Sequence, residues 1–357
     1  MLYTRRDIGR IALAAGAAAK LRGAEKPNSN FNGVQIGAIT YSYRQLPNSN
    51  DAHQVLQYVL DSNISAIELM GPVAESFAGA PSAGRGGFGG GQRGPGGTPG
   101  GPGGPSAGAN SAAAGEAPAG GGQGQGRGRG GRAPLTPEQQ AAQQRAAEDL
   151  KKWRLSASMD KYKEFRKLYN DAGVSVYAYK LEPRPTMSDE EYDYIFNVAE
   201  TLGASHVTLE LSNDEKFLKR IGDFAAKRHM LVAYHAHTQA SMTAWDTALE
   251  LSPGNAINLD CGHYFAGTGE SPIPLILKRH DRIASMHLKD RRKQGTPGGD
   301  NLPWGKGDTP IKEILQTVRD NKYPFPASIE YEYQTPEGSD VLTEMRKCVQ
   351  YCKDALA

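Results

Sequence analysis

Cysteine, histidine and long apolar runs are scarce in this sequence, and the scarcity excludes several classes of protein. Three cysteines in 357 residues do not make the disulfide framework that holds small secreted domains together. The N-terminal apolar stretch, residues 11–19, is too short to span a bilayer, and no other segment is a candidate. The GxxxxGKS or GxxxxGKT pattern of phosphate-binding loops is also missing, although 43 residues are glycine. Because only eight residues are histidine, the position of each one is informative.

Glycine is abundant, but most of it lies in one segment. Residues 81–133 hold 23 of the 43 glycines, mixed with Pro, Ser, Ala, Gln and Arg. Such a composition buries too little apolar surface to offset the entropy of ordering the chain, so we predict a disordered, neutral insertion over 78–135. A helix is expected next, over 136–153, because Thr136-Pro-Glu-Gln139 has the form of a capping box with Pro at the first helical position.

The N-terminus has the features of an export signal. Arg5 and Arg6 precede the Ala-rich apolar stretch, as they do in twin-arginine signals. We therefore predict a signal over 1–24 and a periplasmic or exported protein, with an ordinary basic N-terminal arm as the alternative.

The net charge of the whole chain, +2, hides an uneven distribution. Residues 1–24 and 81–133 each carry a net charge of +4, which leaves the rest of the chain near −6. An acidic folded part argues against a nucleic-acid-binding surface, so we expect no nucleic-acid partner.

Short apolar strands alternate with helical stretches along the remaining chain. Strands are expected near 35–41, 65–69, 174–180, 205–210, 231–236, 256–260, 283–288 and 327–331. Helices are expected near 50–62, 159–172, 189–202, 213–228, 241–251, 272–280, 310–321 and 337–355. This alternation is typical of parallel βαβ units, and about 280 residues suit one barrel. We predict an α/β fold, a single (β/α)8 TIM barrel over 34–355, with the insertion after its second strand.

Ionisable residues end the last four predicted strands. They are His235, Asp260, His287 and Glu330. In a barrel of parallel strands these ends meet at one mouth, where active sites lie. Two imidazoles and two carboxylates suit a borderline divalent cation such as Mn, Zn, Co or Fe, whereas Mg or Ca prefers an all-oxygen set. The pattern therefore predicts one divalent metal ion held by these four residues.

Further polar residues are expected around the same mouth. His237 and Glu332 lie two residues after His235 and Glu330, so their side chains point the same way and are candidates for proton transfer or for support of the ligands. Glu210 ends the fourth strand and is a further candidate base. The candidates for substrate binding are Glu68, Lys180 and Lys289. Glu68, Glu210 and Lys180 could equally pair with neighbouring barrel residues.

Four short motifs occur in the order of the predicted strands: Leu259-Asp260-Cys-Gly-His263, Met286-His287-Leu-Lys-Asp290, Gly305-Lys-Gly-Asp308 and Ser328-Ile-Glu330. Together they resemble the xylose isomerase-like TIM-barrel superfamily, which includes sugar-phosphate isomerases, ketose 3-epimerases and an endonuclease branch. The resemblance covers 34–76 and 155–355. It implies the four metal ligands named above and a substrate contact for His263. Many epimerases have glutamate at the position of His235, and its absence removes one of their two paired acid/base groups.

These features predict an exported, metal-dependent enzyme that acts on a small carbohydrate. The expected reaction is proton abstraction next to a carbonyl through a metal-stabilised enediolate. It would lead to isomerisation, epimerisation or elimination on a ketose or 3-keto-glycoside. The candidate acid/base groups are Glu330, Glu332, His237 and Glu210.

Two other functions stay open on the sequence alone. An endonuclease-like phosphodiesterase on the same barrel would need two or three metal ions. A non-catalytic periplasmic carbohydrate-binding barrel would need none. The number of bound ions separates these three interpretations, and the sequence leaves homo-oligomerisation undecided.

Overall fold

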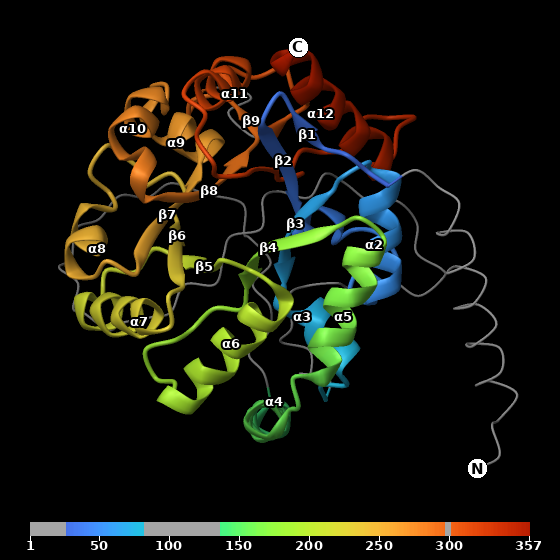
Figure 1. The fold of residues 1–357 in the computed structure, drawn as a ribbon, viewed down its shortest axis with the longest axis vertical. Coiled ribbons are helices and arrows are strands. Elements are labelled where there is room, and N and C mark those ends of the chain that lie inside the picture. The colour runs from blue at the N-terminus through green and yellow to red at the C-terminus, as the bar shows by residue number, and fades with distance from the viewer. Residues whose placement is uncertain (1–25, 82–135, 297–300) are drawn as a thin grey trace, which may run out of the picture.

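The computed structural model describes residues 26–81, 136–296 and 301–357, which form a closed barrel of parallel strands (Figure 1). The barrel strands are β2 (Val34–Ile39), β3 (Ala66–Met70), β4 (Ser175–Lys180), β5 (His206–Glu210), β6 (Leu231–His235), β7 (Asn255–Asp260), β8 (Ile283–Leu288) and β11 (Ala327–Ile329). The ring closes because β2 pairs in parallel with both β3 and β11. The predicted TIM barrel is confirmed.

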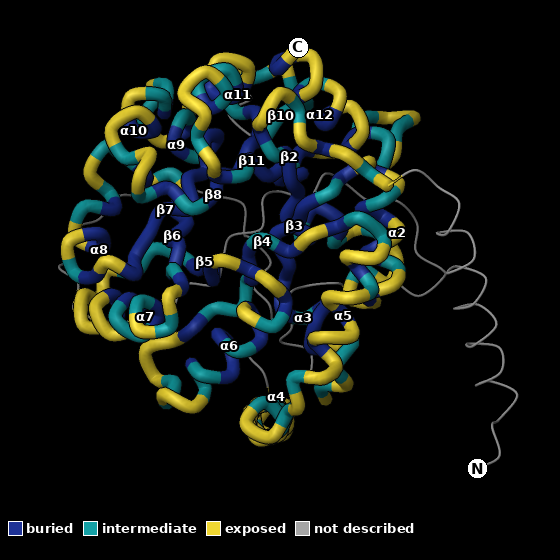
Figure 2. The backbone as a smooth tube through the Cα atoms, in the orientation of Figure 1, coloured by how far each residue is buried: buried dark blue, intermediate teal, exposed yellow. Residues whose placement is uncertain are grey.

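Helices surround the barrel. They are α2 (Ala52–Asp61), α5 (Asp160–Asp171), α6 (Asp189–Leu202), α7 (Glu215–Lys227), α8 (Asp246–Leu251), α10 (Ile273–Arg279), α11 (Ile311–Asp320) and α12 (Val341–Leu356). In α11 the buried residues are Ile311, Ile314, Leu315 and Val318, a stripe at helical spacing that faces the sheet. The strands are buried and the outer surfaces of the helices are exposed (Figure 2), so the core lies between these two layers and inside the ring.

Several short elements were not expected from the sequence. They are β1 (Asn30–Phe31), the 3-10 helices η1 (Thr40–Tyr43) and η3 (His280–Arg282), α3 (Gly71–Ala78), α9 (Cys261–Thr268), and the hairpin of β9 (Asp290–Arg291) with β10 (Asn301–Leu302). Gly262 lets α9 lie close against the end of β8, because a Cβ there would collide with the Lys289 side chain and lie 2.6 Å from its carbonyl oxygen. This close approach brings the start of α9 to the barrel mouth.

The helix expected over 136–153 is α4 (Pro137–Ser156), and Thr136 and Gln139 make both hydrogen bonds of its capping box. The predicted export signal over 1–24 and most of the predicted insertion over 78–135 lie outside the described residues. Within the described ranges, each helix is too short or too polar to cross a membrane.

An ion pair fastens α4 to the barrel. Arg154 donates from Nε and Nη2 to the two carboxylate oxygens of Glu75 on α3, at 2.7 and 2.9 Å, and the Tyr194 hydroxyl also donates to Glu75. The Arg154 and Glu75 side chains are 17% and 7% exposed, so water screens the pair poorly.

Replacing Arg154 with alanine would leave the buried Glu75 carboxylate with one donor. We expect the free energy of unfolding to fall by about 3 kcal/mol, measured by urea denaturation. Lys151→Ala is the matched control, because Lys151 is also on α4 and pairs with Glu191 of α6, but its side chain is 50% exposed. The expected loss of unfolding free energy is below about 1 kcal/mol. Equal losses in the two variants would contradict this account of how α4 is held.

Candidate active site

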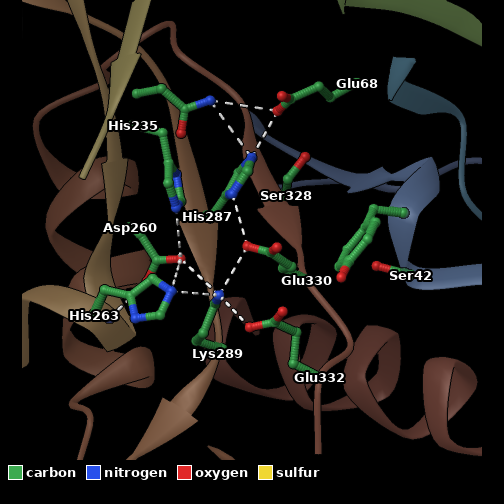
Figure 3. Close-up of polar contacts among 12 residues, drawn as sticks. Ser42, Glu68, His235, Asp260, His263, His287, Lys289, Ser328, Glu330 and Glu332 are labelled. Atoms are coloured by element: carbon green, nitrogen blue, oxygen red, sulfur yellow. Dashed lines mark hydrogen bonds and ion pairs between the residues drawn. The ribbon is translucent and has the colours of Figure 1, made fainter. Parts of the chain in front are cut away.

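The register of the barrel places the carboxyl ends of neighbouring strands side by side. His235 pairs with Glu210 across β5 and β6, Asp260 pairs with His287 across β7 and β8, and Glu330 directly follows β11. One nitrogen or oxygen from each of His235, Asp260, His287 and Glu330 lies within 4.8 Å of the others, and all four residues are buried (Figure 3). We call these four residues the ligand cluster. Their service as metal ligands stays a prediction.

His287 lies between two carboxylates. Its Nε2 is 2.6 Å from Glu68 Oε2, and its Nδ1 is 2.9 Å from Glu330 Oε2. Burial alone would lower the pKa of His287, but the attraction of Glu68 and Glu330 outweighs it and raises the pKa to about 10. Burial would raise the pKa of Glu68, yet the charge of His287 and their hydrogen bond hold it at about 2. At neutral pH the pair is therefore an imidazolium and a carboxylate.

Lys289 is a buried cation beside the ligand cluster. Its Nζ lies 3.0 Å from Asp260 Oδ2, 2.9 Å from Glu330 Oε2 and 2.7 Å from Glu332 Oε2. Burial opposes the charge of Lys289, but these carboxylates raise its pKa above the usual range. An ammonium has three N–H donors, and three carboxylates surround this one. These ion pairs make Lys289 a counter-ion within the protein, and its expected contact with substrate stays a prediction.

Asp260 has two tasks, one for each oxygen. Its Oδ1 accepts a hydrogen bond of 2.6 Å from the backbone N–H of His263 and so caps the N-terminus of α9. Its Oδ2 lies 4.0 Å from His235 Nε2 and faces the ligand cluster. The three-residue spacing of Asp260 and His263 in the sequence is thus the spacing of a helix N-cap.

Two further imidazoles line the mouth, and both are uncharged at neutral pH. Burial, reinforced by nearby Lys289, holds the pKa of His263 well below its usual value, and burial lowers the pKa of His235 to about 4. Arg291 Nη1 lies 2.6 Å from His263 Nδ1. Lys289 Nζ lies 3.2 Å from His263 Nε2, so both ring nitrogens face cationic groups that only donate hydrogen bonds and disfavour a charged ring.

A second set of polar side chains lies at the rim of the barrel, where β4, β5 and β6 end. Lys180 Nζ donates to Glu210 Oε1 at 3.2 Å and lies 3.6 Å from Glu182. His237 Nε2 is 3.8 Å from Glu210 Oε2, and half of the His237 side chain is exposed. Burial would raise the pKa of Glu210, but Lys180 outweighs it and lowers the pKa. The structure thus brings His237, Glu210 and Lys180 to the same mouth as the ligand cluster.

The residues that hold Glu68 were missed by the sequence analysis. Thr208 donates its hydroxyl proton to Glu68 Oε1 at 2.5 Å, and Asn258 Nδ2 lies 3.4 Å from Oε2. Thr208 and Asn258 each lie two residues before a strand-end carboxylate, Glu210 and Asp260. The alternation of side chains along a strand was therefore the signal that could have placed both on the inner face.

The buried charges of the site are out of balance. Asp260 Oδ2 makes no hydrogen bond, although Lys289 Nζ is 3.0 Å away, because the angle of approach is unfavourable. His235 Nδ1 also has no hydrogen-bond partner among the described residues. Among the described residues, the carboxylates of Glu68, Asp260, Glu330 and Glu332 form ion pairs with two cations, His287 and Lys289. Counted by formal charge, these six side chains sum to −2, which fits a divalent cation.

Curated relatives cover only part of the chain. An inosose dehydratase from Clostridium botulinum (strain Eklund 17B / Type B) is 27% identical over 156 residues, which are 38% of this chain and 52% of that protein. An inosose dehydratase from Clostridium tetani (strain Massachusetts / E88) is 26% identical over 162 residues, 40% of this chain and 53% of that protein. The chain thus spans about half the length of the curated relatives it matches.

Solved structures share the fold over most of the chain. The probable 3-DHS dehydratase of Bacillus anthracis has a TM-score of 0.53 at 14% identity and covers 88% of this chain and 98% of that one. An L-ribulose 3-epimerase has a TM-score of 0.50 at 9% identity and covers 90% of this chain and 95% of that one.

The model of the family described as xylose isomerase-like TIM barrel matches residues 140–351, which is more than half of the sequence. The chain therefore belongs to the xylose isomerase-like TIM-barrel family, as its strand-end motifs had indicated.

Proposed function

We propose that this chain is a metal-dependent enzyme that removes a proton next to the carbonyl of a small carbohydrate or cyclic polyol ketone. The ligand cluster, buried at the barrel mouth with a net negative charge, is the observation that carries the proposal. A divalent ion there would polarise a carbonyl and stabilise the negative charge that develops on its oxygen. The names of the relatives support this class, because dehydration and epimerisation beside a carbonyl both begin with loss of the adjacent proton.

Glu332 and His237 are the groups best placed to move protons. Both lie at the mouth and are partly exposed, whereas Glu330 and Asp260 are buried behind them. We assign proton removal to Glu332, whose carboxylate is held by Lys289 and Asn301, and proton return to His237, beside Glu210.

Elimination of water is favoured over two-base epimerisation. His235 stands where many epimerases have their second glutamate, and it is buried and neutral. An elimination needs one base to take the proton and one acid to protonate the leaving hydroxyl, which Glu332 and His237 supply. The dehydratases among the relatives support this order of preference.

The test is exchange of the proton for deuterium. The full chain, loaded with Mn²⁺ or Zn²⁺, is incubated in D₂O with ketoses, inososes and 3-keto-glycosides, and NMR follows deuterium at the carbon beside the carbonyl and formation of an alkene. We expect exchange with at least one class, lowered by about 10³-fold in Glu330→Gln.

Glu337→Gln is the matched control, because Glu337 is exposed on the segment that follows Glu330. Its exchange rate should equal that of the wild type. Absence of exchange with every class, despite one bound ion, would favour a carbohydrate-binding barrel. Two or three bound ions per chain would favour the phosphodiesterase.

A further inference from the structure

We propose that Glu68 is a positioning residue that keeps a proton on Nε2 of His287 and thereby presents Nδ1 as the metal-binding nitrogen. This inference rests on the metal centre proposed above. It gives Glu68 a different role from the substrate contact expected from the sequence.

The two nitrogens of His287 face opposite sides. Nδ1 is 2.9 Å from Glu330 Oε2, so it points into the ligand cluster. Nε2 is 2.6 Å from Glu68 Oε2, on the other side of the ring (Figure 3). A carboxylate only accepts hydrogen bonds, so in the metal-free protein both ring nitrogens carry a proton. Glu330 belongs to the ligand cluster, whereas Glu68 lies outside it. A metal ion in the cluster would take the place of the proton on Nδ1, and Glu68 would keep the proton on Nε2.

Glu68 is itself held in place from three strands. It lies on β3, where the pairing with β4 shifts register between Ile67 and Glu68, an irregularity of the kind that re-aims a side chain. Thr208 on β5 donates to one carboxylate oxygen, and Asn258 on β7 lies within 3.4 Å of the other. The side chain is 0% exposed, so a substrate at the mouth cannot reach it. Thr208 and Asn258 thus hold the carboxylate against His287.

This arrangement matches the physical need of a histidine ligand. If the proton moved to Nδ1, the lone pair on Nε2 would face the negative charge of Glu68 in a buried site, and the ring would point an N–H at the metal. A carboxylate on the far nitrogen fixes the tautomer and makes the metal-binding nitrogen more basic, which raises metal affinity.

The first measurement is the affinity of the full chain for Zn²⁺, by competition with a chelating dye. Glu68→Gln should weaken zinc binding by about 10–100-fold, because the amide keeps the shape but loses the charge. Glu75→Gln is the matched control, since Glu75 is also a buried carboxylate next to β3 but contacts Arg154 and Tyr194. Its zinc affinity should equal that of the wild type. Wild-type affinity in Glu68→Gln would overturn the proposal.

The second measurement is ¹⁵N NMR of the histidine rings in the zinc-loaded protein. It reports which ring nitrogen binds zinc, and a merely structural role for Glu68 would not affect that choice. We expect zinc on Nδ1 of His287 and a solvent-protected proton on Nε2, and a loss of that protection in Glu68→Gln. Zinc on Nε2 would overturn the role of Glu68 and leave the metal centre standing. Failure of the wild type to bind zinc would overturn the metal centre and this role with it.

Discussion

Lys289→Met should destabilise the metal-free protein by about 3–5 kcal/mol. Methionine has a similar length and fills the same space, so packing changes little. The loss is electrostatic, because the buried carboxylates of Asp260 and Glu330 would lose the ammonium that lies 3.0 and 2.9 Å away. Differential scanning calorimetry of the metal-free protein measures the change in Tm.

Added Zn²⁺ should raise the Tm of Lys289→Met more than that of the wild type, because the ion neutralises the same carboxylates. Lys180→Met is the matched control at the same mouth. The side chains of its partners Glu182 and Glu210 are 36% and 41% exposed, so water can solvate their carboxylates when the lysine is removed. We expect the free energy of unfolding to fall by about 1 kcal/mol or less. A metal-free Lys289→Met variant as stable as the wild type would show that the carboxylates do not need this cation.

The barrel and the ligand cluster could be predicted because both follow from strand ends. Alternating strands and helices indicate parallel pairing, and parallel strands bring their carboxyl ends to one face. His235 is the last residue of β6, and Asp260 is the last residue of β7. His287 lies in β8, and Glu330 directly follows β11. The TIM barrel was confirmed, and the structure places these four residues together.

The partners of each charge could not be predicted, because they depend on contacts across the barrel. Glu68 and His287 are 219 residues apart in the sequence, and the pairing of β3 with β4 shifts register next to Glu68. The sequence also does not show that three carboxylates surround Lys289. Helix α9 was missed because its two glycines disfavour a helix, although the Asp260 cap starts one.

Zinc binding near neutral pH should release about one proton per ion, so the apparent affinity should rise about tenfold per pH unit between pH 6 and 8. The proton comes from His287, whose pKa of about 10 in the metal-free protein means that Nδ1 is protonated at neutral pH. His235 adds no proton, because its pKa of about 4 leaves it neutral throughout this range. The sign follows from the direction of the His287 shift: raising the pH removes the proton that competes with the metal.

Isothermal titration calorimetry at pH 7 in buffers of different ionisation enthalpy gives the number of protons released. Glu68→Gln removes one of the two charges that raise the pKa of His287, so its proton release should be smaller and its affinity should depend less on pH. A pH-independent affinity with no proton release in the wild type would mean that the ion binds without His287. In that case the buried imidazolium between Glu68 and Glu330 is a permanent counter-ion, and the metal centre would have to be built from the remaining cluster residues.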